Sequence, residues 1–392
     1  MTLNPEIFVW ARDKAGLSLG EAARALGFKD AERRSAVERL AALESGEHGP
    51  SKSVLRRMSK AYRRSLLVFY LDEPPRTGDR GRDFRTVPGS PPPAYDPLLD
   101  ALIRDVRGRQ SIVRSLLEDE EAEPLDFVGS VTMDTPPTEL AHLIPARIQF
   151  LLQKFRGQRS VAEAFAYLRD RLEASGIFVL LVGNLGSHHT NIPVETFRGF
   201  TIADPVAPFI VVNDQDAQIA WSFTALHEAV HIWLGDTGVS SPSIDAGIER
   251  YCNDVAGDIL LPRSELQELA HLEGASIEQA IEAIAVFARS RKVSRPMVAY
   301  KLLQSRVINE PAWRALDTRL KAERLESREG QREVDETDGG PSYYVVKRHR
   351  LGPALLNLVN RSLNEGSLTY TRAGQALGVK PRNIDPLLHR GL

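Results

Sequence analysis

The chain has 392 residues, of which 42% are hydrophobic and 26% charged, and its formal net charge is −2 at pH 7. This length predicts two or three domains with packed cores, and the near-neutral charge excludes a histone-like polyelectrolyte as a description of the whole chain. The single cysteine, Cys252, excludes an intrachain disulfide framework and a multi-cysteine metal site. No apolar stretch approaches the roughly 20 residues of a membrane-spanning helix, and the N-terminus lacks the pattern of a secretion signal. We therefore expect a cytoplasmic protein without membrane contact.

Residues 1–72 are predicted to form a basic, all-helical module. The first 70 residues hold 13 Lys and Arg against 8 Asp and Glu. Ser18 and Glu21 have the spacing of a capping box at a helix start, and small residues followed by Gly27 are typical of a helix-turn-helix. The order of these segments resembles the Cro/repressor (XRE) helix-turn-helix family. That resemblance implies a recognition helix in the DNA major groove and, by analogy, a homodimer.

The segment 28–43 is longer than the usual turn and recognition helix of that family. Its cations are the candidate DNA contacts, although the sequence does not decide which of them would read bases: Lys29, Arg33, Arg34 and Arg39. The alternative is a helical domain that binds a protein partner, or nothing.

A connector rich in Pro and Arg is predicted at residues 73–97, because its composition supports no helix. Residues 98–310 are then predicted to form an α+β domain, mainly helical with a small three-stranded sheet. An unbroken apolar and β-branched run bounded by glycines indicates a buried strand at 177–182. Two further short strands are expected at 197–203 and 209–212, with turn residues between them. Helical periodicity indicates its helices: 98–121, a broken stretch at 137–172, 216–234, 248–260, 277–290 and 295–307. A charged tether is expected at 311–342, followed by a C-terminal helical segment at 343–392.

The motif that carries chemistry is His227-Glu228-Ala229-Val230-His231, an H-E-x-x-H pentapeptide. On a helix, residues four apart share one face, so the two imidazoles can converge on one Zn²⁺. Glu228 would then act as the general base that takes a proton from zinc-bound water. The alternative is a core helix that carries two satisfied histidines and a glutamate without a chemical role.

Catalytic zinc needs a third protein ligand and an open fourth position. The extended pattern H-E-x-x-H-x-x-G-x-x-H is excluded, because Leu234 and Thr237 occupy its last two fixed positions. A carboxylate from the following helix is therefore expected, and Glu249 is the preferred candidate because 18 residues separate it from His231, enough for a loop and a returning helix. The other carboxylates in reach are Asp254 and Asp258 on the same helix, and Asp236 and Asp245 in the loop.

Three segments around this motif resemble the ImmA/IrrE family of bacterial zinc metallopeptidases: 210–213, 223–231 and 249–262. In that family a strand ending in Asn precedes the zinc helix, and the Glu that opens the later segment is the third ligand; this position corresponds to Glu249. The resemblance covers roughly residues 140–310. It implies a peptidase whose substrate is a repressor of the same helix-turn-helix type, either a partner or this chain itself.

Two functions follow from these patterns. The first is a zinc metallopeptidase fused to a DNA-binding domain, which regulates transcription by cleaving a repressor in stress, mobile-element or toxin-antitoxin control. The second is a non-catalytic DNA-binding regulator or antitoxin whose zinc domain is a sensor or a protein-binding platform. The C-terminal segment around 368–380 looks like a second small helix-turn-helix, but a hairpin that packs on the peptidase is the preferred interpretation.

Overall fold

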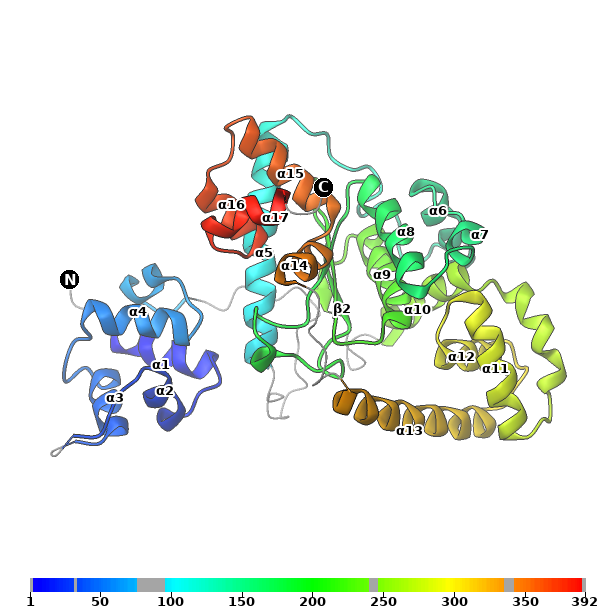
Figure 1. Ribbon diagram of the computed structural model, residues 1–392, viewed down its shortest axis with the longest axis horizontal. Helices are drawn as coiled ribbons and strands as arrows, with labels where there is room; N and C mark the ends of the chain where they lie inside the picture. Colours follow the sequence, from blue (N-terminus) through cyan, green and yellow to red (C-terminus); the bar gives the residue numbers. More distant parts are fainter. Residues whose placement is uncertain (1–2, 32–33, 76–95, 240–245, 335–341, 390–392) are drawn as a thin grey trace. The chain divides into compact units, whose positions relative to one another are not determined.

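The computed structural model describes residues 3–31, 34–75, 96–239, 246–334 and 342–389 (Figure 1). The chain divides into two compact units, of which the first comprises residues 1–105 and 184–196 and the second residues 106–183 and 197–392. The predicted connector lies mostly at 76–95, outside the described residues. Among the described residues, no helix has both the length and the apolar character needed to cross a membrane.

The first unit is built from short helices around one apolar core. Its elements are α1 (Pro5–Lys14), α2 (Leu19–Ala25), α3 (Ala36–Glu44), α4 (Lys52–Ala61), the 3₁₀ helices η1 (Leu66–Tyr70) and η2 (His188–Thr190), and the first part of α5 (Asp96–Asp119). The capping box predicted from Ser18 and Glu21 is present at the start of α2. The connection from α2 to α3 spans the ten residues 26–35, which makes it longer than the tight turn of a compact helix-turn-helix.

The second unit contains a mixed sheet, and its α+β fold class is as predicted. The three predicted strands are present as β1 (Phe178–Leu181), β2 (Gly199–Ile202) and β3 (Phe209–Val212), all fully buried. A two-residue strand, β4 (Gly238–Val239), extends this sheet beside β2. The strand order is β1-β3-β2-β4, with β1 parallel to β3 and β2 antiparallel to both β3 and β4.

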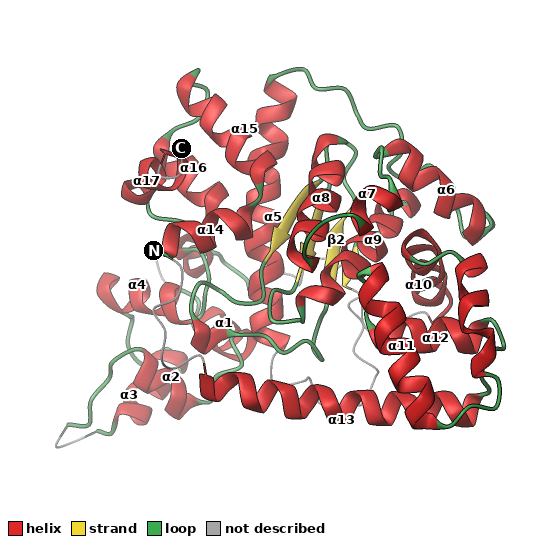
Figure 2. Ribbon diagram, turned by 45° about the vertical axis from the view of Figure 1, so that its right-hand side comes forward, coloured by secondary structure: helices red, strands yellow, loops and turns green. Residues whose placement is uncertain are grey.

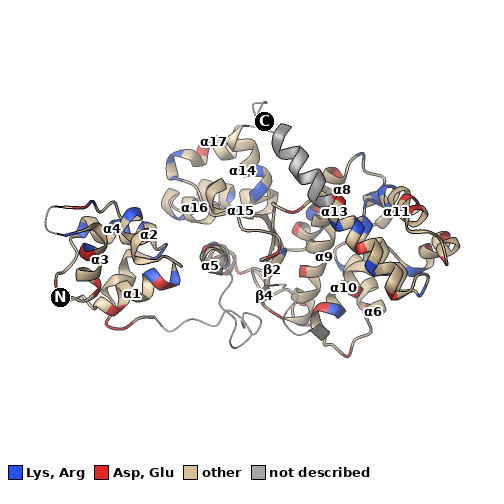
Figure 3. Ribbon diagram, turned by 90° about the horizontal axis from the view of Figure 1, so that it is seen from below, with Lys and Arg blue, Asp and Glu red and all other residues tan. Residues whose placement is uncertain are grey.

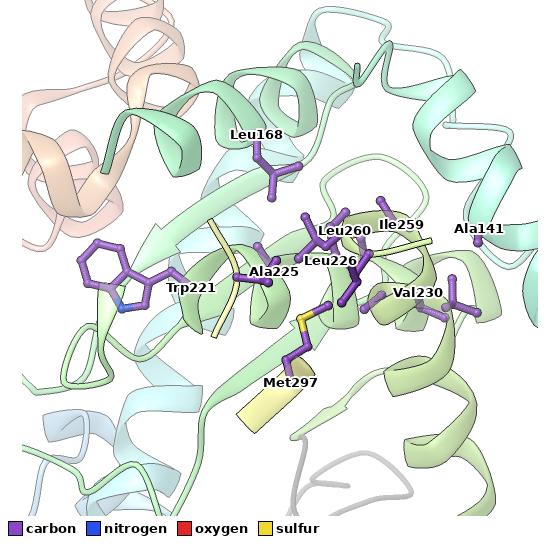
Figure 4. Close-up of a cluster of buried hydrophobic side chains, with 14 of the residues drawn as sticks. Ala141, Leu168, Trp221, Ala225, Leu226, Val230, Ile259, Leu260 and Met297 are labelled. Atoms are coloured by element: carbon purple, nitrogen blue, oxygen red, sulfur yellow. The ribbon is translucent and has the colours of Figure 1, made fainter. Parts of the chain in front are cut away.

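Helices surround this sheet (Figure 2). The remaining elements before the C-terminal segment are α6 (Pro137–Arg147), α7 (Leu152–Arg156), α8 (Val161–Ala174), α9 (Gln218–Leu234), α10 (Ala246–Leu260), η3 (Arg263–Leu272), α11 (Ile277–Arg291), α12 (Arg295–Gln304) and α13 (Glu310–Val334). The helix α9 lies against β2 and β3, and α10 packs on α9 and α6. Their apolar faces share one buried cluster, which includes Leu226, Val230 and Leu260 (Figure 4).

The charged segment predicted as a tether is instead helical from Glu310 to Val334. Leu316 and Leu320 are buried, and α13 packs on α12 and α11. Arg295 on α12 forms an ion pair with Glu323 on α13 at 2.8 Å. Ala312 and Trp313 of α13 also pack against the core, so a few apolar residues on one face hold this charged helix. The rest of the predicted tether, 335–341, lies outside the described residues.

The first two helices of the C-terminal segment pack on the sheet and on α8. The segment comprises α14 (Tyr343–Leu351), α15 (Pro353–Asn364), α16 (Tyr370–Leu377), η4 (Pro381–Asn383) and α17 (Ile384–His389), with α14 against β1 and α15 against α8. The buried guanidinium of Arg169 donates to the backbone oxygens of His349 and Arg350 and pairs with Glu173 at 2.9 Å. Glu173 also accepts from the backbone N–H of Ala354 at 2.8 Å. One buried ion pair therefore anchors both α14 and α15.

Candidate metal centre

The helix α9 presents both histidines of the H-E-x-x-H motif to one buried site. His227 and His231 are 5% and 3% exposed, and their Nε2 atoms lie 3.3 Å apart. The helix ends at Gly235, whose φ of 69° reverses the chain. A side chain at that position would also collide with the backbone of Gly129, because its Cβ would lie 2.9 Å from the Gly129 Cα. Glycine is therefore required where the loop turns back toward His231.

Glu249 on α10 completes the set of donors. Its Oε2 lies 3.3 Å from the Nε2 of His227, and its Oε1 lies 3.7 Å from the Nε2 of His231. Donor atoms about 2.0–2.1 Å from one tetrahedral zinc ion lie about 3.3 Å from each other. The three side chains therefore fit a single divalent ion, and they leave one tetrahedral position for a water or a substrate.

The opposite ring nitrogens of the two histidines each face an oxygen atom. The Nδ1 of His227 lies 3.1 Å from the Oδ1 of Asn253, and the Nδ1 of His231 lies 3.5 Å from the Oδ2 of Asp236. An Nδ1–H that faces an oxygen leaves the lone pair of Nε2 free to bind a metal. Asp236, a weaker candidate for the third ligand, thus contacts the side of His231 opposite Nε2.

The other candidate ligands are engaged elsewhere. The carboxylate of Asp254 accepts a hydrogen bond from Gln304, and Asp258 pairs with the buried Lys301. Asp245 lies outside the described residues.

Glu228 is 0% exposed and faces the strand β2. The hydroxyl of Thr201 lies 2.9 Å from the Oε2 of Glu228 and 2.9 Å from its backbone oxygen. Gly199 lies two residues earlier on the same face of the strand, and a Cβ there would approach the Oε1 of Glu228 to 2.6 Å. These two residues of β2 therefore form a close-fitting pocket for the Glu228 carboxylate.

Cys252 lies beside the same histidines. Its Sγ and one nitrogen of each of His227 and His231 all lie within 4.8 Å of one another. Burial raises the pKa of the Cys252 thiol, which favours its neutral form. Burial also disfavours the charged form of His231, but hydrogen bonding to Asp236 and Cys252 outweighs this effect and raises the pKa of the imidazole well above its ordinary value.

Asn253, Thr201 and Cys252 are the site residues that sequence reasoning did not select for a role at the metal. Glu249, Cys252 and Asn253 are spaced i, i+3 and i+4, so they share one face of α10. Once Glu249 was the preferred ligand, helical periodicity could have indicated that Cys252 and Asn253 also lie near the metal. No comparable local signal links Thr201 to Glu228, because the two are 27 residues apart.

In the first unit, three of the four candidate DNA contacts are described. Lys29, Arg34 and Arg39 are exposed. The guanidinium of Arg39 lies 5.3 Å from the centre of the Phe28 ring and donates to the backbone oxygen of Lys29, while Arg34 lies 3.4 Å from Glu47. Arg33 lies outside the described residues.

Comparison with known proteins gives one match. Residues 186–303 match the family model described as the IrrE N-terminal-like domain, Peptidase_M78. The matched segment contains β2, β3, α9 and α10, and with them every donor of the candidate metal centre. No curated protein and no solved structure matches the chain.

Proposed function

We propose that the second unit is a zinc-dependent metalloendopeptidase. The observation that carries this proposal is the convergence of the Nε2 atoms of His227 and His231 and the carboxylate of Glu249 within 3.3–3.7 Å, with Glu228 between the two histidines in sequence. The similarity of residues 186–303 to a metallopeptidase family supports it. Three protein donors with an open fourth position are characteristic of catalytic zinc sites.

The chemistry follows from these residues. A zinc ion held by the three donors would polarise the scissile carbonyl and lower the pKa of water. Glu228 takes a proton from the attacking water and later delivers it to the leaving amine, as a general base and then a general acid. Thr201 holds one carboxylate oxygen of Glu228, and Asn253 and Asp236 keep the imidazoles turned with Nε2 toward the shared centre.

The first unit is proposed to bind DNA as a homodimer, by analogy with repressor-type helix-turn-helix domains, and the protein is proposed to act in the cytoplasm. Its exposed cations Lys29, Arg34 and Arg39 would contact the duplex, chiefly its phosphates. The peptidase would then control transcription by cleaving a helix-turn-helix repressor, either a partner protein or another copy of this chain.

The test compares the wild-type chain with Glu228→Gln. Metal content is measured by mass spectrometry, and cleavage is followed on a candidate repressor and on the chain itself. We expect about one zinc per chain in both proteins and cleavage only by the wild type. Equal cleavage by the two proteins would refute the role of Glu228, and absence of stoichiometric zinc from the wild type would refute the site.

The position of Cys252 supports a second candidate function. If its thiolate bound the metal together with His227, His231 and Glu249, the site would have four protein ligands and no open position, as structural and sensory zinc sites do. Under this alternative Cys252→Ala lowers zinc affinity by more than tenfold, and the wild type cleaves nothing. Under the peptidase proposal the same variant keeps its zinc.

A further inference from the structure

The C-terminal segment is the most basic part of the chain. Residues 343–392 contain eight Lys and Arg against two Asp and Glu, a net charge of +6, whereas residues 71–342 contain 29 against 42, a net charge of −13. A basic segment attached to an acidic body is typical of a surface that binds a polyanion.

Two of these cations hold the segment on the rest of the second unit, and a third joins two helices of the segment to each other. Arg350 pairs with Asp214 at 2.6 Å, Arg361 pairs with Glu120 at 2.6 Å, and Arg348 donates to the backbone oxygens of Leu387 and Leu388 at 3.1 Å. Arg350 and Arg361 are therefore paired with acidic residues outside the segment, and Arg348 joins α14 to α17.

Three other cations are directed to solvent. Arg372 on α16, Lys380 in the following turn and Arg382 in η4 are exposed, and within the described part of the chain none of them forms an ion pair. Figure 3 marks the Lys and Arg positions along the ribbon in blue. Asp385 is the one acidic residue after position 365, and its Oδ1 accepts a hydrogen bond from the Tyr370 hydroxyl at 2.9 Å. The surface around α16 and η4 is therefore positively charged.

The backbone there has the geometry of a compact helix-turn-helix. The helix α16 ends at Leu377, the turn has three residues, and η4 begins at Pro381 and continues directly into α17. Gly378 opens the turn with φ 60° and ψ 42°. Gly374, one turn earlier, packs so closely that a Cβ there would lie 2.8 Å from the backbone oxygen of Val379. Glycine is thus required at two positions, one for the left-handed turn and one for the close approach of α16 to the turn.

Buried side chains pack the two helices against each other. They come from both sides of the turn: Ala373 and Leu377 on α16, and Ile384 and Leu387 on α17. By comparison, ten residues separate α2 from α3 in the first unit. The C-terminal pair therefore fits the helix-turn-helix pattern, with its three- to four-residue turn, more closely than the pair in the first unit does.

We propose that α16, the turn and η4–α17 form a second helix-turn-helix that binds double-stranded DNA through Arg372, Lys380 and Arg382. In such a motif the first helix lies across the phosphate backbone and the start of the second enters the major groove. Arg372 and Lys380 would contact phosphates, and Arg382, at the start of the second helical segment, would reach the groove. The anchors at Arg169, Arg350 and Arg361 hold the motif on the second unit, so this binding does not depend on the first unit.

The experiment measures binding of the full-length chain to a fluorescently labelled 40-base-pair duplex of random sequence by anisotropy, between 50 and 200 mM salt. The test variant carries Arg372→Ala, Lys380→Ala and Arg382→Ala together. Each phosphate contact contributes about 0.9 to the slope of log K against log salt. We therefore expect the slope to fall by about 2–3 in the variant and the affinity at 100 mM salt to fall at least tenfold.

Two further variants make the result specific. The first removes three exposed cations elsewhere in the second unit, with the same change in net charge: Lys154→Ala, Arg289→Ala and Arg319→Ala. We expect the affinity of this control for the duplex to stay within twofold of the wild-type affinity. If the control loses as much affinity as the test variant, then the total charge of the chain determines DNA binding and the proposal is overturned. The second variant removes the candidate contacts of the first unit: Lys29→Ala, Arg34→Ala and Arg39→Ala.

The outcomes separate this inference from the proposed function. Wild-type affinity in the test variant, with loss only in the first-unit variant, would overturn the second motif and leave the first unit as the DNA-binding part. Loss in the test variant alone would support the second motif and contradict the role of the first unit. A wild-type chain without affinity for the duplex at 50 mM salt would overturn both assignments to DNA, whereas the zinc and cleavage measurements test the peptidase separately.

Discussion

Replacing Glu249 with glutamine is expected to weaken zinc binding by about two orders of magnitude. The Glu249 oxygens lie 3.3 Å and 3.7 Å from the Nε2 atoms of His227 and His231, so the change removes an anionic donor while it keeps the size of the side chain. Four-ligand zinc sites bind with about 10–16 kcal/mol, which corresponds to roughly 3 kcal/mol per ligand. At 1.4 kcal/mol per factor of ten, this loss is about a hundredfold in the dissociation constant.

The assay is competition for zinc with a chromogenic chelator at pH 7.5, with Asp254→Asn as the matched control. That variant has the same change of charge on the same helix, and asparagine can still accept the hydrogen bond from Gln304. We expect the control to bind zinc as the wild type does. If Glu249→Gln binds within threefold of the wild type while Cys252→Ala loses its zinc, then the thiol is the third ligand and the argument from donor distances is wrong.

Three other changes test the packing and the chemistry. Arg169→Met leaves the carboxylate of Glu173 buried without its ion-pair partner and is expected to lower the free energy of unfolding by about 3–5 kcal/mol in urea titrations; a loss below about 1 kcal/mol would show that the pair does not anchor the C-terminal segment. Thr201→Val is expected to lower kcat for the candidate repressor by about 10–100-fold with zinc retained, and Thr201→Ser to restore it, because one hydrogen bond to a charged group contributes about 1.5–3 kcal/mol. Burial and the neighbouring guanidinium of Arg169 lower the pKa of His349 in the folded protein, so the unfolded chain binds its proton at higher pH. The stability that comes from an uncharged His349 is therefore lost as the pH falls below about 6.5. We expect His349→Gln to reduce the difference between the free energies of unfolding measured at pH 7.5 and at pH 5.5. An unchanged difference would show that His349 is not the source of this pH dependence.

Most of the secondary structure could be predicted from the sequence, because local patterns determine it. The strands β1 and β3 are unbroken apolar runs, and Ser18 and Glu21 form the capping box that their spacing predicts. The charged segment that became α13 could not be predicted in this way. This helix is stabilised by Leu316 and Leu320, which are buried where α13 packs against α12 and α11. The amino-acid composition of the segment does not show which other helices it will contact.

The sequence by itself determined the two histidines and the glutamate between them, because helical spacing alone places His227 and His231 on one face of α9. Only the tertiary structure decided which carboxylate joins them. Three acids on α10 were available, and the packing of α10 against α9 and α12 turns Glu249 toward the histidines while Asp254 and Asp258 bond to residues of α12. That choice depends on contacts between residues 18 to 50 positions apart in the chain, which the geometry of a single helix cannot specify.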